Sequence, residues 1–115
     1  MVRKPRTDSR GWLERLYCSE ELAAAGFATP PLQINRSCTK GAGTIRGMHF
    51  QSPPHCEVKF VSCTVGEVFD VAVDLRPRSR TFLKWFGVHL SAENRTSLLI
   101  PVGFAHRFHV LSPDA

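Results

Sequence analysis

The clearest pattern along the chain is an alternation of apolar and polar side chains between positions 67 and 76. On an extended strand, four apolar residues would lie on one side and three polar residues on the other: Phe69, Val71, Val73 and Leu75 against Asp70, Asp74 and Arg76. This period of two predicts a β-strand with one buried face. The polar face would either line a wet cavity or be solvated.

Four other segments have the length and composition of strands, and turn-forming residues separate them: 58–65, 83–90, 97–100 and 105–111. Only one short segment predicts a helix. Ser19 is expected as its N-cap, the acidic residues that follow suit the positive end of the helix dipole, and Gly26 is expected to end it. Short strands with almost no helix indicate an all-β fold, either a β-sandwich or a small barrel.

Composition adds a few bounds. The chain has 115 residues, which favours a single domain, and its 43% hydrophobic and 22% charged residues are typical of a soluble globular protein. No apolar run approaches the ~20 residues that cross a bilayer, and no secretory signal is recognisable. The cytoplasm is therefore the expected location, and no membrane partner is expected.

The net charge of +5 raises the question of nucleic-acid binding. The basic residues are spread along the chain, and only a mild cluster occurs near the N-terminus, at Arg3, Lys4, Arg6 and Arg10. No nucleic-acid-binding motif accompanies them, so no nucleic-acid partner is expected. An enzyme acting on small molecules that carry a diphosphate would have the same charge balance.

The segment Arg46-Gly47-Met48-His49 is the most informative for chemistry. On a regular strand Arg46 and His49 would point to opposite faces. They can face one ligand only if a bulge or kink occurs at Gly47, and a glycine inside a strand often marks such a place. The alternative is an edge histidine beside a solvated arginine.

Lys59 is unusual because its neighbours on one face of the predicted strand, including Val61 and Cys63, are apolar. A lysine on such a face is costly unless it is paired or faces a cavity; otherwise its stem covers apolar surface and its head reaches water. On the next strand, either Asp70 or Asp74 could orient a histidine or a lysine across the sheet.

The spacing P-x-G-x-x-H from Pro101 to His106 matches the second motif of the cupin jelly rolls. A cupin metal site would also need an H-x-H pair and a later glutamate in the first motif. Here His49 stands alone, and two histidines with at most Glu57 would make a poor site for a first-row metal. No metal and no other cofactor is therefore expected, and a metal-dependent cupin is kept as an alternative.

Six blocks of the chain resemble, in family order, motifs of the dTDP-4-dehydrorhamnose 3,5-epimerase family. The motifs are D-x-R-G-aromatic, Q-x-N-x-S, R-G-(L/M)-H-F-Q, D-V-x-V-D-L-R, L-S-A-E-N and I-P-x-G-F-A-H, at 8–12, 33–37, 46–51, 70–76, 90–94 and 100–106. The resemblance implies a cupin-like jelly roll and an isomerase that inverts C3, C5 or both in a dTDP-4-keto-6-deoxyhexose. Such enzymes serve the biosynthesis of dTDP-rhamnose or a related deoxysugar.

The resemblance also implies roles for individual residues. His49 would be the base that removes a proton beside the sugar ketone, Lys59 would stabilise the resulting enolate, and His106 would donate a hydrogen bond near the same oxygen. Arg46 and Arg10 would bind the diphosphate, and the nucleotide and sugar would contact Gln33 and Asn35. A homodimer is implied, with the segment around Arg10 reaching into the partner subunit.

The chain departs from the family pattern in three ways. It is expected to lack a C-terminal segment that brings a general-acid tyrosine and an aspartate to the catalytic histidine; Tyr17 is not at that position. Arg107 replaces a glycine, and Leu13 stands where an aromatic residue is expected. A further alternative is therefore a catalytically incomplete copy that only binds the nucleotide-sugar.

Overall fold

The computed structural model describes residues 1–27 and 29–115. These residues form two compact units, one of Met1–Val2 with Cys38–Ala115 and one of Arg3–Ser37. Across the part of the chain that the structure describes, no helix is long and apolar enough to cross a membrane.

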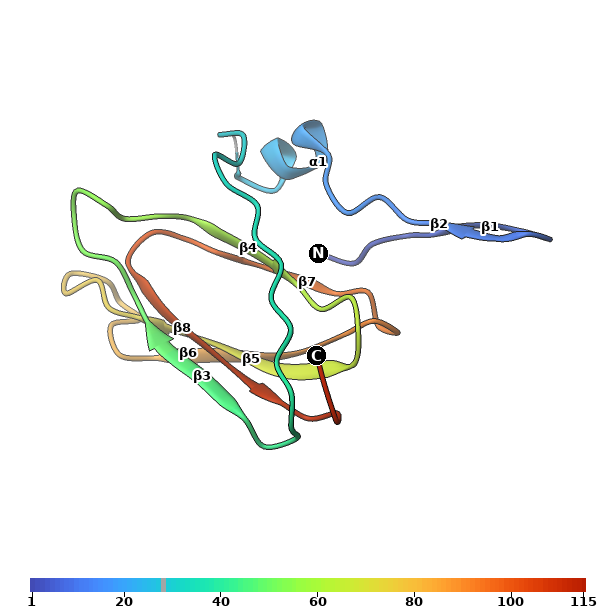
Figure 1. The fold of residues 1–115 in the computed structure, drawn as a ribbon. Helices are drawn as coiled ribbons and strands as arrows, with labels where there is room; N and C mark the ends of the chain where they lie inside the picture. The colour runs from blue at the N-terminus through green and yellow to red at the C-terminus, as the bar shows by residue number, and fades with distance from the viewer. Residues whose placement is uncertain (28) are drawn as a thin grey trace. The chain divides into compact units, whose positions relative to one another are not determined.

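The larger unit contains two antiparallel layers of strands (Figure 1). Its strands are β3 (Ile45–His49), β4 (Lys59–Ser62), β5 (Glu67–Asp74), β6 (Trp85–Ser91), β7 (Ser97–Ile100) and β8 (Phe104–Val110). One layer is a four-stranded sheet in the order β3-β8-β5-β6, and the other is the pair β4-β7. The predicted strands are confirmed, with ends that differ from the expected ones by a few residues.

The core of this unit lies between the two layers. Val68 of β5 pairs with Leu90 of β6 and with Val110 of β8, so all three side chains lie on one face of the larger sheet. They form a buried cluster with Cys63, and half-buried residues of the smaller sheet, Val61 among them, pack against it. This face of the four-stranded sheet is therefore the interior face of the sandwich.

The register along β5 extends this interior face to the aspartates. Asp70 and Asp74 are two and six residues beyond Val68 on the same side of the strand, and their exposed fractions are 0% and 1%. Of the two alternatives left open for the polar face, the solvated one is wrong for Asp70 and Asp74. Phe69 and Val73, predicted to be on the buried side, lie on the outer face and are only partly buried.

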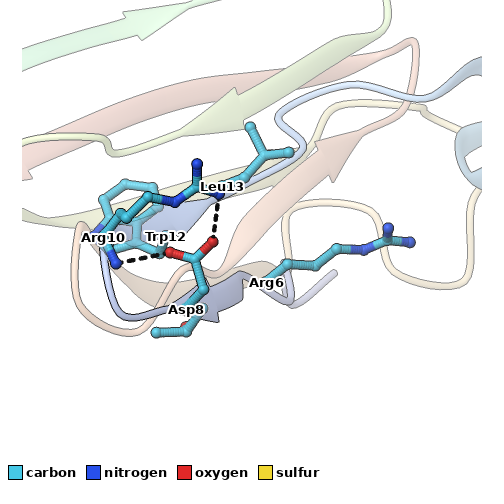
Figure 2. Close-up of a pocket in the computed structure, with 7 residues that line it drawn as sticks. Arg6, Asp8, Arg10, Trp12 and Leu13 are labelled. Carbon is cyan, nitrogen blue, oxygen red and sulfur yellow. Dashed lines mark hydrogen bonds and ion pairs between the residues drawn. The ribbon is translucent and has the colours of Figure 1, made fainter.

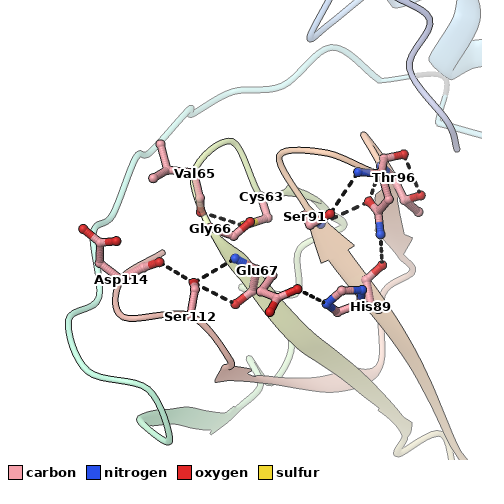
Figure 3. A network of polar contacts seen from close by, with 10 residues as sticks. Cys63, Val65, Gly66, Glu67, His89, Ser91, Thr96, Ser112 and Asp114 are labelled. Atoms are coloured by element: carbon pink, nitrogen blue, oxygen red, sulfur yellow. Dashed lines mark hydrogen bonds and ion pairs between the residues drawn. The ribbon is translucent and has the colours of Figure 1, made fainter.

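A network of polar contacts lies at the end of the larger sheet that contains the core cluster (Figure 3). In the turn that follows β6, the Ser91 amide donates to Asn94 Oδ1 and the Asn94 amide donates to Ser91 Oγ, at 3.1 and 2.9 Å. Short side chains that bond nearby backbone groups in this way favour turns. On the outer face, His89 Nε2 lies 2.9 Å from Glu67 Oε2. The predicted turn at 91–94 is confirmed.

The smaller unit holds a two-stranded hairpin, β1 (Arg6–Asp8) with β2 (Gly11–Leu13), and the helix α1 (Ser19–Ala24). The sequence analysis did not predict the hairpin. It placed the helix correctly but shifted its start, because Cys18 is the N-cap and Ser19 is the first helical residue. Gly26 ends the helix as expected: its φ of 93° lets the Phe27 amide bond the Leu22 carbonyl at 2.8 Å.

Candidate active site

A bulge in β3 brings Arg46 and His49 to the same face of the sheet. Arg46 pairs with Phe108 and His49 pairs with His106, and the register shifts by one residue between the two pairs. Phe108 and His106 are two residues apart on β8, so their side chains lie on one face of the sheet. Residues paired across two strands point to the same face, so Arg46 and His49 lie on that face as well. The irregularity expected at Gly47 is therefore present in the structure.

Gly47 allows this bulge for two reasons. Its φ is 113°, in a region that side chains with a Cβ rarely adopt. A Cβ at this position would also lie 2.6 Å from the His106 carbonyl oxygen and 2.7 Å from Arg107 Cβ. Arg107 itself pairs with Val71 and lies on the outer face, as its alternation with His106 predicts. The backbone of β3 can thus approach β8 this closely only because residue 47 is a glycine.

His106 forms a buried pair with Asp70. His106 Nε2 lies 2.9 and 3.0 Å from the two carboxylate oxygens of Asp70, and the side chains are 11% and 0% exposed. A carboxylate accepts hydrogen bonds, so Nε2 carries the hydrogen and the ring is held in one orientation. This leaves Nδ1 of His106 for another partner. Of the two aspartates considered from the sequence, Asp70 is the one that orients a histidine.

Asp74 has a different environment. Its carboxylate accepts bonds from the Arg76 guanidinium at 2.8 and 2.9 Å, and from the hydroxyls of Ser79 and Thr81, both at 2.6 Å. The bond from Arg76, followed by those from the two hydroxyls, outweighs desolvation and holds the pKa of Asp74 well below its ordinary value. The Arg76 guanidinium also lies 4.7 Å from the ring centre of Phe104. Asp74 therefore fixes a turn and faces no histidine.

Lys59 lies on the interior face of the smaller sheet. It is two residues from Val61 and shares its face, and Val61 packs against the core cluster. The Lys59 side chain is 26% exposed, so it reaches the edge of this face.

The ammonium group of Lys59 has a partner that the sequence analysis did not assign to it. Lys59 Nζ lies 3.2 Å from Glu57 Oε1. The signal available in the sequence was the spacing of two residues, which puts both side chains on one face of an extended chain. The sequence analysis considered Glu57 only as a possible metal ligand.

Within residues 1–27 and 29–115, no group of three or more histidine, cysteine, aspartate or glutamate side chains is arranged to hold a metal ion. His106 and Asp70 use each other as partners, which leaves few donors for a cation.

The remaining predicted residues belong to the smaller unit. Arg10 bonds Asp8 twice, through its amide and its guanidinium, at 2.8 Å each (Figure 2), and the guanidinium bond is the main cause that lowers the pKa of Asp8. With Arg6, Trp12 and neighbouring residues they line an open pocket of about 440 Å³. Gln33 Nε2 donates to Asn35 Oδ1 at 3.0 Å, and both side chains are exposed.

Comparison with known proteins gives one consistent result. The sequence model of the dTDP-4-dehydrorhamnose 3,5-epimerase family matches residues 1–115. The epimerase of Shigella flexneri is 60% identical over 110 residues, which are 94% of this chain and 60% of the relative. This chain therefore spans about 60% of the length of that curated relative.

Solved structures agree. The epimerase of Bacillus anthracis, with TDP and PPi bound, superposes with a TM-score of 0.94 at 41% identity, over 98% of this chain and 65% of the other. The enzyme of Legionella pneumophila, in complex with dTDP-4-keto-L-rhamnose, gives a TM-score of 0.84 at 38% identity, over 97% of this chain and 59% of the other. The fold is a cupin-like jelly roll, as predicted, and the chain belongs to the dTDP-4-dehydrorhamnose 3,5-epimerase family.

Proposed function

We propose that the protein epimerises a dTDP-4-keto-6-deoxyhexose at C3, C5 or both, by removing and replacing a proton beside the ketone. The observation that carries this proposal is the pairing of His49 with His106 across the bulge at Gly47, with Asp70 behind His106. Together with Lys59 on the smaller sheet, it gives two imidazoles and one ammonium on interior faces of one unit. Family membership supplies the class of substrate.

His49 takes the proton in this scheme. The hydrogens at C3 and C5 are acidified by the ketone at C4, and an imidazole has a basicity suited to removing them near neutral pH. As the C–H bond breaks, its electron pair moves toward the C4 oxygen and an enolate forms. In this scheme a water molecule delivers a proton to the opposite face of the same carbon, which inverts it, and His49 passes the proton it took to solvent.

His106 and Lys59 stabilise the enolate in this scheme. Asp70 holds the His106 ring in one orientation through Nε2, so Nδ1 points at a substrate oxygen without reorganising and donates to it when the ring carries a proton on both nitrogens. Lys59 adds a positive charge from the opposite layer of the sandwich. Fixed donors aimed at developing negative charge are the strongest known contribution to catalysis of this kind.

The same proposal assigns the diphosphate to Arg46 and Arg10, whose planar guanidinium groups suit phosphate oxygens. Gln33 and Asn35 would contact the nucleotide and the sugar. A homodimer is part of the proposal, with the segment around Arg10 contributing to the partner subunit, and so is a cytoplasmic location. Sedimentation of the purified protein tests the dimer, and a monomer at all concentrations would contradict it.

Solvent exchange tests the chemistry. The purified protein is incubated with dTDP-4-keto-6-deoxyglucose in deuterated water, and mass spectrometry follows deuterium in the sugar. We expect incorporation that His49→Asn slows by about 10²-fold or more, because a positioned base contributes that much. Binding of the nucleotide-sugar with no incorporation would instead favour the catalytically incomplete copy.

A further inference from the structure

The ammonium group of Lys59 lies at the edge of an apolar face, and it forms an ion pair with Glu57, which precedes β4. Glu57 Oε1 lies 3.2 Å from Lys59 Nζ, and the two side chains are 46% and 26% exposed. Glu57 belongs to the connection between β3 and β4, which starts directly after His49. The Cys56 thiol bonds the Gln51 carbonyl at 3.3 Å within this connection, which folds the chain back on itself.

The buried carboxylates of the interior face already have other partners. Both oxygens of Asp70 lie within hydrogen-bonding distance of His106. The carboxylate of Asp74 accepts bonds from Arg76, Ser79 and Thr81. Glu57 is the carboxylate that contacts Lys59, so the orienting task considered for Asp70 or Asp74 falls to Glu57 in the case of the lysine.

We propose that Glu57 is a positioning residue that holds the ammonium group of Lys59 toward the enolate oxygen. This inference rests on the proposed function. A lysine head has three donors on a stem with four rotatable bonds, so an untethered Lys59 samples many positions. One bond to Glu57 restricts the stem and leaves two donors for the substrate.

The tether acts on the reaction more than on binding. The positive charge of Lys59 matters most when negative charge develops on the C4 oxygen, whereas the nucleotide is held by other groups. Misplacing the ammonium therefore lowers the turnover rate and leaves the affinity for the nucleotide-sugar nearly unchanged.

The test uses Glu57→Gln, which keeps the size and an acceptor oxygen but removes the charge. The chain offers a matched control in Glu67→Gln. Glu67 also forms a half-exposed ion pair, with His89 at 2.9 Å, but on the outer face of the larger sheet. We expect Glu57→Gln to lower the maximal deuterium-exchange rate about fivefold, the scale of a partly exposed ion pair, with KM changed by less than about twofold. Glu67→Gln is expected to leave both parameters as they are.

A second readout does not depend on turnover. A lysine ammonium in a stable ion pair exchanges its hydrogens slowly enough to give a ¹H–¹⁵N signal in NMR, and Lys59→Arg assigns that signal by removing it. We expect the Lys59 signal in the unsubstituted protein and in Glu67→Gln, and its loss in Glu57→Gln. A signal that persists in Glu57→Gln, or that is absent in the unsubstituted protein, would overturn the contact.

The two readouts separate this inference from the proposed function. If the NMR signal depends on Glu57 but the exchange rate does not, the positioning role is wrong and the epimerase proposal stands. If the unsubstituted protein exchanges no faster than His49→Asn, the proposed function is wrong, and with it the catalytic role of Glu57.

Discussion

The two ends of the interior face of the larger sheet are built from the same strands but contain different chemistry. At one end, Val68, Leu90 and Val110 pair across three strands and form an apolar cluster with exposed fractions of 6%, 0% and 0%. One or two pairs further along the same ladders, the interior residues are Asp70 and His106. We call these the packed end and the polar end.

The difference shows how a small sheet can bury polar groups. Apolar side chains at the packed end need only fit one another, because burial itself stabilises them. The buried carboxylates at the polar end have partners in place: Asp70 has His106, and Asp74 has a guanidinium and two hydroxyls. Unpaired, such groups would be costly to bury.

Removing packing at the packed end should have the largest effect on stability. Leu90→Ala deletes a fully buried side chain, and we expect the free energy of unfolding in urea to fall by about 3 kcal/mol. The deuterium-exchange rate of the folded protein should stay close to that of the unsubstituted protein. A loss of exchange in a variant that remains folded would contradict the separation of the two ends.

The sequence predicted the polar end better than the packed end. Alternation along 67–76 located β5 and grouped Asp70 with Asp74, and Gly47 marked the bulge. The same alternation did not decide which face is interior, because a polar face that lines a cavity and one that is solvated give the same pattern. Which face is interior depends on the register of Val68 with Leu90 and Val110, which no local pattern contains.

Other features were beyond local patterns for similar reasons. The resemblance identified His49, Lys59 and His106, but pairing His106 with Asp70 requires β8 and β5 to be neighbours, and they are 36 residues apart in these positions. The hairpin β1-β2 was missed because its strands have three residues each and are exposed. Glu57 was missed as a partner of Lys59 because it was weighed only as a metal ligand.

Disrupting the bulge in β3, where His49 pairs with His106 of β8, should have the next largest effect on stability. Gly47→Ala forces a Cβ against the β8 backbone at a φ of 113°, and Gly43→Ala is the control, since Gly43 has a φ of 87° but nothing within 4 Å of its Cβ. We expect Gly47→Ala to cost about 2 kcal/mol more in urea unfolding than the control, and to lose deuterium exchange. Equal costs for the two variants would mean that the close approach of β3 to β8 is unimportant.

The pair of aspartates offers a sharper comparison within the polar end. Asp70→Asn weakens the hold on His106, and we expect the exchange rate to fall about tenfold, as for a lost bond to a charged group. Asp74 lies on the same strand and the same face, but its carboxylate bonds no histidine. The exchange rate of Asp74→Asn should therefore fall less than that of Asp70→Asn. If the two variants are equally slow, Asp70 has no special role.

The smallest expected effect is a pH dependence. Because the folded pKa of Asp74 is depressed, its bonds stabilise the protein fully above the ordinary value of 3.8, and this stability is lost as the pH falls below that value toward the folded pKa. The difference in unfolding free energy between the unsubstituted protein and Asp74→Asn should be constant from about pH 5 to 8 and shrink below about pH 4. If this difference grew as the pH fell, the folded pKa of Asp74 would have to be raised, which would contradict the lowered pKa given above.

The most direct test of the central claim is to map where a nucleotide-sugar binds. In an NMR titration with dTDP-glucose, which lacks the ketone and cannot react, the account predicts amide shifts concentrated at the polar end, around Arg46, His49, Lys59 and His106. Shifts concentrated instead around Leu90 and the turn at 91–94, at the packed end, would contradict it.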